Sequence, residues 1–176
     1  SIWDSLLTLL DNFYKLGEYE KIFALSKELE NMGVTKYFMG MSLFRLDRIE
    51  DARLAFSDIP KDDRFYPYAR IAIVQIRVMR QQLKEVEDEL RDLLNISNIG
   101  QNLIERVRML LGQIAFEKGA FSDALIEFNR IPFKSPFYEE ALLGQAWSLV
   151  KLSSFEESLS ILKKIKSPDL YNTAQQ

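Results

Sequence analysis

Apolar side chains recur along the chain at three- and four-residue spacing, in segments separated by short turns. This spacing is typical of amphipathic α-helices. The first such segment has its apolar positions at Leu6, Leu9, Leu10 and Phe13. The chain then turns at Gly17, and a second segment with Ile22, Leu25 and Leu29 runs to Gly33. No segment alternates with a period of two residues as a strand would. The pattern therefore predicts an all-α protein built from helical hairpins.

One stretch of the sequence occurs twice, with all six matching residues at the same offset in the numbering. The first copy contains Phe56, Ile59, Pro60, Phe65, Tyr66 and Ala69, and the second contains Phe128, Ile131, Pro132, Phe137, Tyr138 and Ala141. Aligning the residues that follow each predicted turn, which are Tyr19, Ile49, Leu83, Phe121 and Phe155, gives a shorter period of about 34 residues. Periods of this length mark repeat architectures built from helix pairs. We expect about five pairs in a single array, at 3–32, 33–66, 67–102, 105–136 and 139–168.

The residues at the turns and helix crossings of these units resemble the tetratricopeptide repeat family, of the bacterial type. The matching positions are Leu111, Gly112, Gly119, Ala120, Phe121, Ala124 and Phe128 in the fourth unit, Gly40, Ala52, Phe56, Ile59 and Pro60 in the second, and Ala146, Phe155, Leu162 and Ile165 in the fifth. A small residue where two helices cross lets the backbones approach, and a large one beside it fills the gap. The resemblance implies a right-handed superhelical solenoid of antiparallel helix pairs. The third unit departs from the pattern, since Arg70 and Arg77 stand at usually apolar sites and Val86 replaces a small residue.

The third unit is also four residues longer than the mean, and the ends of the chain look uncapped. We place the extra residues in or near 95–102, as a longer loop or an extended second helix. The chain starts with the apolar residues Ile2, Trp3, Leu6 and Leu7, and residues 169–176 look like the start of a sixth helix pair. Terminal repeats of soluble solenoids usually carry a polar outer face. We therefore expect a part of a longer protein, or a chain that covers its ends by self-association.

The resemblance implies that the first helix of each pair lines a concave surface. In the shared register, this inner face carries Leu7, Asp11, Tyr14, Tyr37, Met41, Phe44, Ile71, Gln75, Val78, Met109, Gln113, Phe116, Leu143, Trp147 and Val150. We predict that a partner contacts Tyr14, Tyr37, Met41, Phe44, Gln75, Gln113, Phe116 and Trp147. A second interpretation stays open, because aromatic side chains on first helices also fill the core between neighbouring repeats.

The inner face is apolar and aromatic, which bears on the kind of partner. Tetratricopeptide domains that grip a terminal carboxylate use Lys, Arg and Asn at these sites, because a buried carboxylate needs charged donors. Here only Arg45 and Lys151 lie at the margins. We therefore predict a scaffold that binds a peptide or helix of another protein along an apolar concave groove, in the assembly of a larger complex. The alternative is a structural module that forms homo-oligomers through its uncapped ends.

Composition narrows the chemistry further. The 176 residues include no His and no Cys, which excludes catalytic triads, thiol nucleophiles and almost all zinc sites. No glycine-rich phosphate loop occurs either. We expect no enzymatic activity, no cofactor and no metal site. The net charge of −3 gives no reason to expect nucleic acid as a partner.

Location is less constrained by the sequence. No apolar run approaches the roughly 18 residues of a membrane-spanning helix, so we expect no transmembrane span. The turn around Ser135 and Pro136 resembles those of bacterial envelope tetratricopeptide proteins. That resemblance favours a periplasmic or cell-envelope location over a cytoplasmic one.

Overall fold

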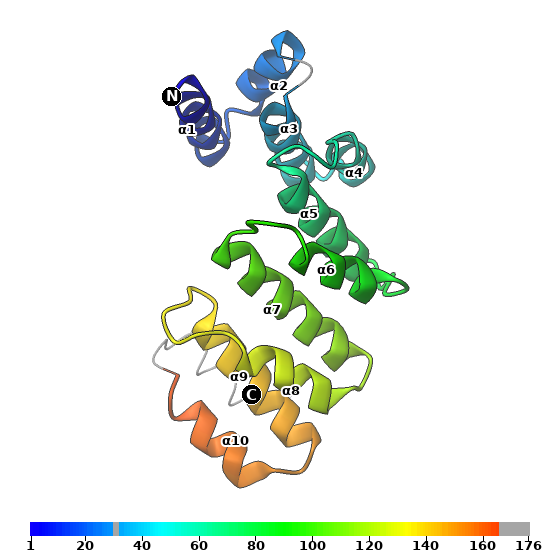
Figure 1. Cartoon of the computed structure of the whole chain (residues 1–176), viewed down its shortest axis with the longest axis vertical. Coiled ribbons are helices and arrows are strands. Elements are labelled where there is room, and N and C mark those ends of the chain that lie inside the picture. The colour runs from blue at the N-terminus through cyan, green and yellow to red at the C-terminus, as the bar shows by residue number, and fades with distance from the viewer. Residues whose placement is uncertain (30–31, 166–176) are drawn as a thin grey trace. The chain divides into compact units, whose positions relative to one another are not determined.

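The computed structural model describes residues 1–29 and 32–165, and these residues form ten α-helices and no β-strand (Figure 1). The helices are α1 (Ile2–Leu16), α2 (Tyr19–Glu28), α3 (Gly33–Arg45), α4 (Ile49–Ser57), α5 (Tyr66–Met79), α6 (Val86–Leu94), α7 (Gln101–Glu117), α8 (Phe121–Asn129), α9 (Tyr138–Lys151) and α10 (Phe155–Leu162). The predicted all-α class is confirmed. The predicted start of a sixth helix pair, 169–176, lies outside the described residues. Within the described ranges, no helix is long and apolar enough to cross a membrane.

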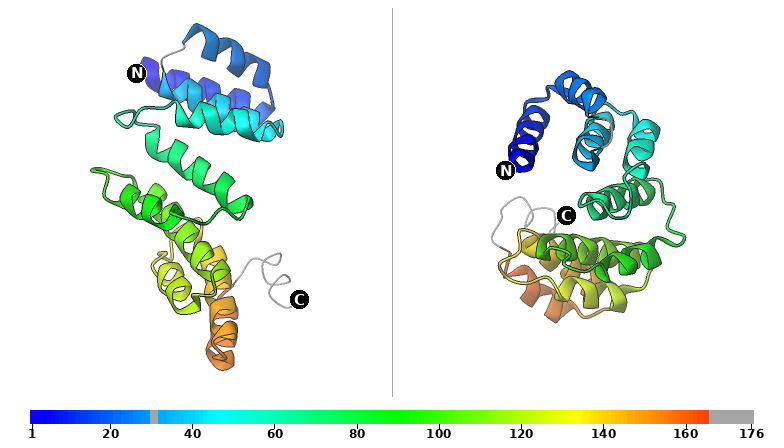
Figure 2. Two further views of the ribbon diagram at one scale, coloured as in Figure 1. Left: turned by 90° about the vertical axis from the view of Figure 1, so that its right-hand side faces the viewer. Right: turned by 45° about the horizontal axis from the view of Figure 1, so that its top comes forward.

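The chain divides into two compact units, Ser1–Gln82 and Leu83–Gln176. The boundary falls inside the predicted third repeat, between α5 and α6. In the first unit, α2 packs against α1 and α3, and α4 packs against α3 and α5, and the helices α1 to α4 lie side by side in both views of Figure 2. In the second unit, α8 packs against α7 and α9. The second helix of a pair is thus covered by the first helix of the following pair.

The turn inside each helix pair has one geometry, repeated five times. A residue with positive φ stands at Gly17, Asp47, Gln81, Gly119 and Ser153, with φ between 56° and 78°. The next residue donates its backbone N–H to the carbonyl five residues earlier, as from Ala120 to Ala115 at 2.8 Å. This hydrogen bond and the left-handed residue before it form the Schellman motif that closes a helix C-terminus.

The turn between pairs is repeated as well, in the two copies of the repeated stretch. In the first copy, Tyr66 N–H donates to the Asp63 carbonyl, and Phe65 N–H donates to the side chain of the same Asp63. In the second copy, Tyr138 N–H donates to the carbonyl of Ser135, and Phe137 N–H donates to the Ser135 hydroxyl. The shared Phe-Tyr residues therefore mark a turn that is closed by a side-chain hydrogen bond. The first helix of the next pair begins directly after this turn.

The third pair differs from both alternatives predicted for its four extra residues. The loop between α6 and α7 is short, at 95–100, and α6 has nine residues like α8. Instead α6 begins five residues after the left-handed Gln81, whereas α8 begins two residues after Gly119. The following helix, α7, has 17 residues against 14 in α9. A second left-handed residue, Glu85 with φ 63°, delays the start of α6.

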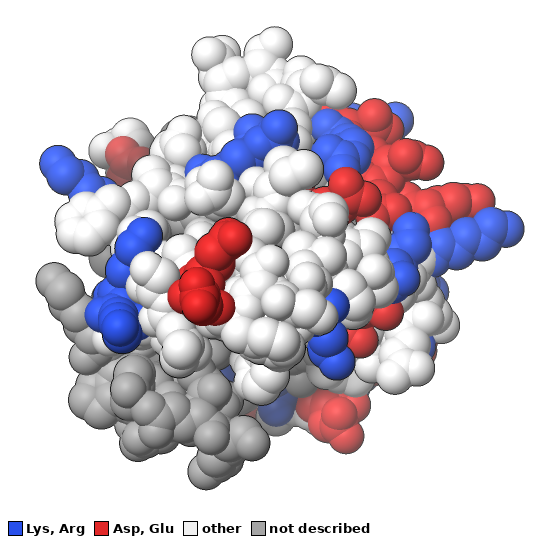
Figure 3. All heavy atoms as spheres, turned by 90° about the horizontal axis from the view of Figure 1, so that it is seen from below, with Lys and Arg blue, Asp and Glu red and all other residues white. Residues whose placement is uncertain are grey.

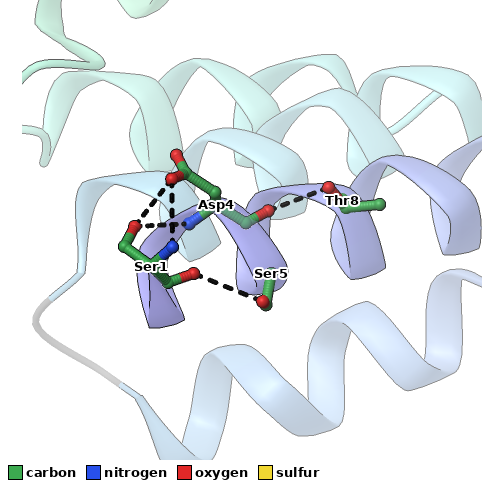
Figure 4. A network of polar contacts seen from close by, with 4 residues as sticks. All are labelled: Ser1, Asp4, Ser5 and Thr8. Carbon is green, nitrogen blue, oxygen red and sulfur yellow. Dashed lines mark hydrogen bonds and ion pairs between the residues drawn. The ribbon is translucent and has the colours of Figure 1, made fainter.

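The first helix begins with a complete capping box (Figure 4). Asp4 N–H donates to Ser1 Oγ at 3.3 Å, and Ser1 Oγ donates to Asp4 Oδ2 at 2.7 Å. The hydrogen bond from Ser1 holds the pKa of the Asp4 carboxyl below its usual value. In the next turn, the hydroxyls of Ser5 and Thr8 donate to backbone carbonyls of α1 itself. These contacts fix the start of α1 without help from another helix.

Candidate interaction groove

A groove of about 210 Å³ lies between α7 and α9 in the second unit. Its nine lining residues are Met109, Gln113, Phe116, Glu117, Phe128, Glu140, Leu143, Gly144 and Trp147. Three of the predicted partner contacts, Gln113, Phe116 and Trp147, are thus brought together in one place. They come from the two first helices of the fourth and fifth predicted pairs. The groove is the candidate site of this chain.

The floor of the groove is the ring of Phe128, which comes from α8 and is only 3 % exposed. Two glycines lie against this ring, one on α7 and one on α9. A Cβ atom built on Gly112 of α7 would lie 2.6 Å from the ring, and one on Gly144 of α9 would lie 2.7 Å away. Both distances are too short for real carbon atoms, so neither position accepts a side chain unless the ring moves. The two glycines therefore let α7 and α9 approach the ring closely.

Apolar side chains form the walls. Trp147 is 38 % exposed, an unusual degree for an indole in the middle of a helix. Phe116 is half-buried and packs its ring against Phe121, with the ring centroids 5.2 Å apart. Met109 is 5 % exposed and belongs to the core beneath the groove. The walls therefore offer an accessible indole and a partly accessible phenyl ring that packs against Phe121.

The polar residues of the groove carry one sign of charge. Glu117 is the last residue of α7 and Glu140 lies in the first turn of α9, and both are exposed. Gln113 Nε2 donates to Glu140 Oε1 at 3.4 Å. The nine lining residues include no Lys and no Arg. Neither glutamate was among the predicted contact residues, because a search for an apolar inner face passes over exposed charges.

The equivalent place in the first unit is filled. The offset that relates the two copies of the repeated stretch replaces Met109 by Tyr37, Glu117 by Arg45, Glu140 by Tyr68, Gly144 by Ala72 and Trp147 by Gln75. The ring of Tyr37 lies 5.8 Å from that of Phe56, 5.5 Å from that of Phe65 and 5.9 Å from that of Tyr68, centroid to centroid. A cluster of aromatic rings thus stands where the second unit has the non-aromatic residues Met109, Glu140 and Gly144.

The remaining predicted contact residues belong to the first unit. Tyr14, Tyr37, Met41 and Phe44 are all half-buried against its core. The ring of Tyr14 lies 6.2 Å from that of Phe38, and burial raises the pKa of its phenol. Gln75 is exposed on α5. In this unit the aromatic side chains of the predicted inner face pack mainly against the core. This agrees with the second interpretation of the sequence, in which such side chains fill the core between neighbouring repeats.

Other polar clusters in the second unit have structural partners. Glu127 of α8 is 5 % exposed, and its carboxylate lies 3.4 Å from Arg91 of α6, 3.3 Å from Arg108 of α7 and 3.5 Å from Arg130. It thereby joins three successive helices. Among the described residues, no group of three or more acidic side chains is arranged to hold a metal ion.

A smaller cavity of about 160 Å³ lies in the first unit, beside the N-terminal end of α3. Its lining includes Trp3, Leu7, Val34 and Phe65 together with Asp63 and Arg64. The Asp63 carboxylate already accepts the Phe65 N–H at 2.7 Å, and Arg64 lies over the Phe65 ring. These polar groups are used by the turn between pairs, so the groove of the second unit is the stronger candidate.

Comparison with known proteins supports the fold. No protein-family model matches the chain, and no curated protein matches it either. Among solved structures, the chain is similar to MamA of AMB-1, with a TM-score of 0.67, 16% identity, and coverage of 88% of this chain and 91% of that one. It is equally similar to YrrB, which is described as a TPR protein with an unusual peptide-binding site, with a TM-score of 0.67, 15% identity, and coverage of 96% and 89%. The chain therefore has the helical-repeat fold of tetratricopeptide repeat proteins, as its sequence predicted.

Proposed function

We propose that this chain is a non-enzymatic scaffold that binds a segment of another protein in the groove between α7 and α9, as part of the assembly of a larger complex. The observation that carries the proposal is the accessible aromatic surface of Phe116 and Trp147, above the buried ring of Phe128, in a groove whose counterpart in the first unit holds a cluster of aromatic rings. Accessible aromatic residues in a depression are the usual anchors of protein interfaces. The similarity to YrrB, a peptide-binding protein of the same fold, agrees with this role.

The size of the groove favours a polypeptide over a small metabolite. Its volume of about 210 Å³ is below the roughly 300–1,000 Å³ of pockets that enclose drug-sized molecules. A space of this size suits one or two apolar side chains of an extended or helical segment, with the remaining affinity coming from contacts along α7 and α9.

Two observations separate this role from catalysis and from nucleic-acid binding. The groove is lined by no Ser, Thr, Lys or Tyr, and the whole sequence has no His or Cys, so the lining holds no hydroxyl, thiol or amine nucleophile. On the face shown in Figure 3, acidic and basic side chains are interspersed around a larger uncharged area, whereas nucleic acid favours a continuous basic surface.

The two tryptophans of the chain allow a direct test. A display library of random peptides is selected on the full chain, and enriched peptides are titrated against a Trp3→Phe variant, in which Trp147 is the remaining indole. We expect enriched peptides to carry a bulky apolar residue and to shift the emission of Trp147. Truncation of a central aromatic anchor typically costs about 2 kcal/mol, so Trp147→Ala should weaken binding at least tenfold.

The matched control is Trp3, which is 57 % exposed and lies outside the groove. Trp3→Phe should bind the enriched peptides as the unaltered chain does. Peptides that bind Trp147→Ala with undiminished affinity, or a selection that enriches no peptide, would refute the proposal.

A second role, self-association through the ends, is favoured by a separate observation. Three apolar residues of α1, spaced seven residues apart, are exposed: Ile2 by 85 %, Leu9 by 42 % and Leu16 by 73 %. At the other end of the described chain, Phe155 and Leu159 of α10 are exposed by 60 % and 58 %. Exposed apolar stripes of this kind mark surfaces that another helix can cover.

A further inference from the structure

We propose that the segment bound in the groove combines a bulky apolar residue with flanking Lys or Arg residues, and that Glu117 and Glu140 select these cations. This inference rests on the proposed function, because it specifies the chemistry of the partner at the same groove. It commits to a basic and apolar segment of another protein, on the ground of charge complementarity.

Glu117 has its charge available for a partner. The neighbouring cation in the sequence, Lys118, is held by Glu87 of α6 at 2.6 Å. Glu117 itself forms no ion pair with the part of the chain that the structure describes. Its carboxylate stands at the C-terminus of α7, where the carbonyl ends of the helix make an anion unfavourable and a cation favourable. A cation that docks at Glu117 would therefore be attracted both by the carboxylate and by the carbonyl ends of α7.

Glu140 is almost as open. Its hydrogen-bond partner in the groove is Gln113, an uncharged donor at 3.4 Å, near the outer limit of a hydrogen bond. Because Gln113 is uncharged, this hydrogen bond leaves the negative charge of Glu140 unneutralised. Both carboxylates therefore keep their negative charge beside an apolar surface where a partner displaces water, which strengthens their attraction for a cation.

The fold itself does not require acidic residues at these places. In the first unit, the position equivalent to Glu117 is Arg45, which is also exposed, and the position equivalent to Glu140 is Tyr68. The same turn and the same helix packing thus accept a cation or an uncharged ring. The negative charge occurs in the unit where the groove is open, which is the expected result if a partner selects it.

The experiment uses the full chain in the Trp3→Phe background, with the peptides enriched in the display selection. Each peptide is synthesised with its flanking positions all Lys, all Gln or all Glu, and binding is followed by the emission of Trp147. Exposed ion pairs contribute modestly, so we expect about tenfold tighter binding of the Lys form than of the Glu form at low salt. The difference should shrink severalfold at about 0.5 M salt, because ions screen exposed charges.

One double variant and one control variant test whether the two glutamates cause this preference. Glu117→Gln combined with Glu140→Gln should abolish the preference for the Lys form over the Glu form. Glu156→Gln removes the same charge from the exposed first turn of α10, outside the groove, and should leave the preference intact.

Equal binding of the three forms, or a preference that persists in the double variant, would overturn the inference and leave the groove itself established. Failure of Trp147→Ala to affect any peptide would overturn the proposed function, and with it this inference. The selected pool gives an independent measure, since it should be enriched in Lys and Arg beside the apolar anchor.

Discussion

At the scale of single residues, the two units differ in which residue supplies the carboxylate that lies between the first helix and the following turn. In the first unit, a Cβ atom on Gly33 would lie 2.2 Å from the Asp63 carboxylate, so the two residues are in direct contact. In the second unit, the equivalent residues are Glu105 and Ser135, and Ser135 Oγ donates to Glu105 Oε2. A carboxylate therefore joins the first helix to the following turn in both units. It comes from the turn in one unit and from the helix in the other.

This exchange predicts a compensated pair of substitutions. Gly33→Glu alone should destabilise the first unit by about 1–3 kcal/mol, because the new side chain collides with Asp63 and adds a like charge. Gly33→Glu with Asp63→Ser recreates the pair found in the second unit, so most of that loss should be recovered. Asp63→Ser alone keeps a side-chain acceptor for the Phe65 N–H, as Ser135 does for Phe137. Urea unfolding of the four proteins gives the coupling energy, and strict additivity of the two changes would contradict the prediction.

Residue identity explains how much of the site the sequence could predict. Gln113, Phe116 and Trp147 could be predicted to share one face because the turn residues set a common register for the first helices, and all three line the groove. Tyr14, Tyr37, Met41 and Phe44 share that register but are half-buried against core, since accessibility depends on the residue across the interface, such as Phe56 against Tyr37. A single sequence does not show which of two equivalent grooves is open. The exchange of Tyr37 for Met109 and of Ala72 for Gly144 was the available signal.

At the scale of helices, the period of the sequence is set by the turns within the pairs. Each of the five residues aligned in the sequence lies two residues after a left-handed residue. The turn geometry is the same whether that residue is Gly119 or Ser153, with φ of 78° and 61°. Helix starts were harder to predict, because Glu85 adopts a left-handed conformation that nothing in its residue type requires. The late start of α6 follows from that conformation.

Because glycine adopts positive φ without steric cost, the turns predict opposite effects of two substitutions in the second unit. Gly119→Ala should lower the unfolding free energy by about 1 kcal/mol, since an added Cβ meets no neighbour within 4 Å and the cost is conformational alone. Ser153→Gly should raise it by about 0.5 kcal/mol, the balance of relieved strain against lost entropy in the folded chain. Thermal unfolding measures both. Changes of the same sign would show that turn conformation does not control the stability of these pairs.

At the scale of the whole molecule, the helices at the two ends of the described chain expose faces that are covered in the interior helices. By alignment of the turns, Leu9 of α1 corresponds to Leu111 of α7, and the two are exposed by 42 % and 1 %. Leu159 of α10 corresponds to Leu125 of α8, and the two are exposed and half-buried respectively. The α1 face matches one that elsewhere receives a second helix, and the α10 face matches one that elsewhere receives a first helix. The two faces are therefore complementary, and packing of α10 of one copy on α1 of another would extend the repeat.

Head-to-tail pairing of this kind has a distinctive test, because each copy uses two different faces. Leu9→Glu and Leu159→Glu should each reduce the mass measured by sedimentation equilibrium, since each places a charge in the contact. A mixture of the two variants should form dimers that do not grow further, because the intact α10 of the first pairs with the intact α1 of the second. Leu54→Glu, at an exposed position on α4, is the control and should associate as the unaltered chain does. If the unaltered chain is monomeric at about 100 μM, near the weak limit for a specific contact of this size, the ends do not pair and the groove remains the proposed interaction surface.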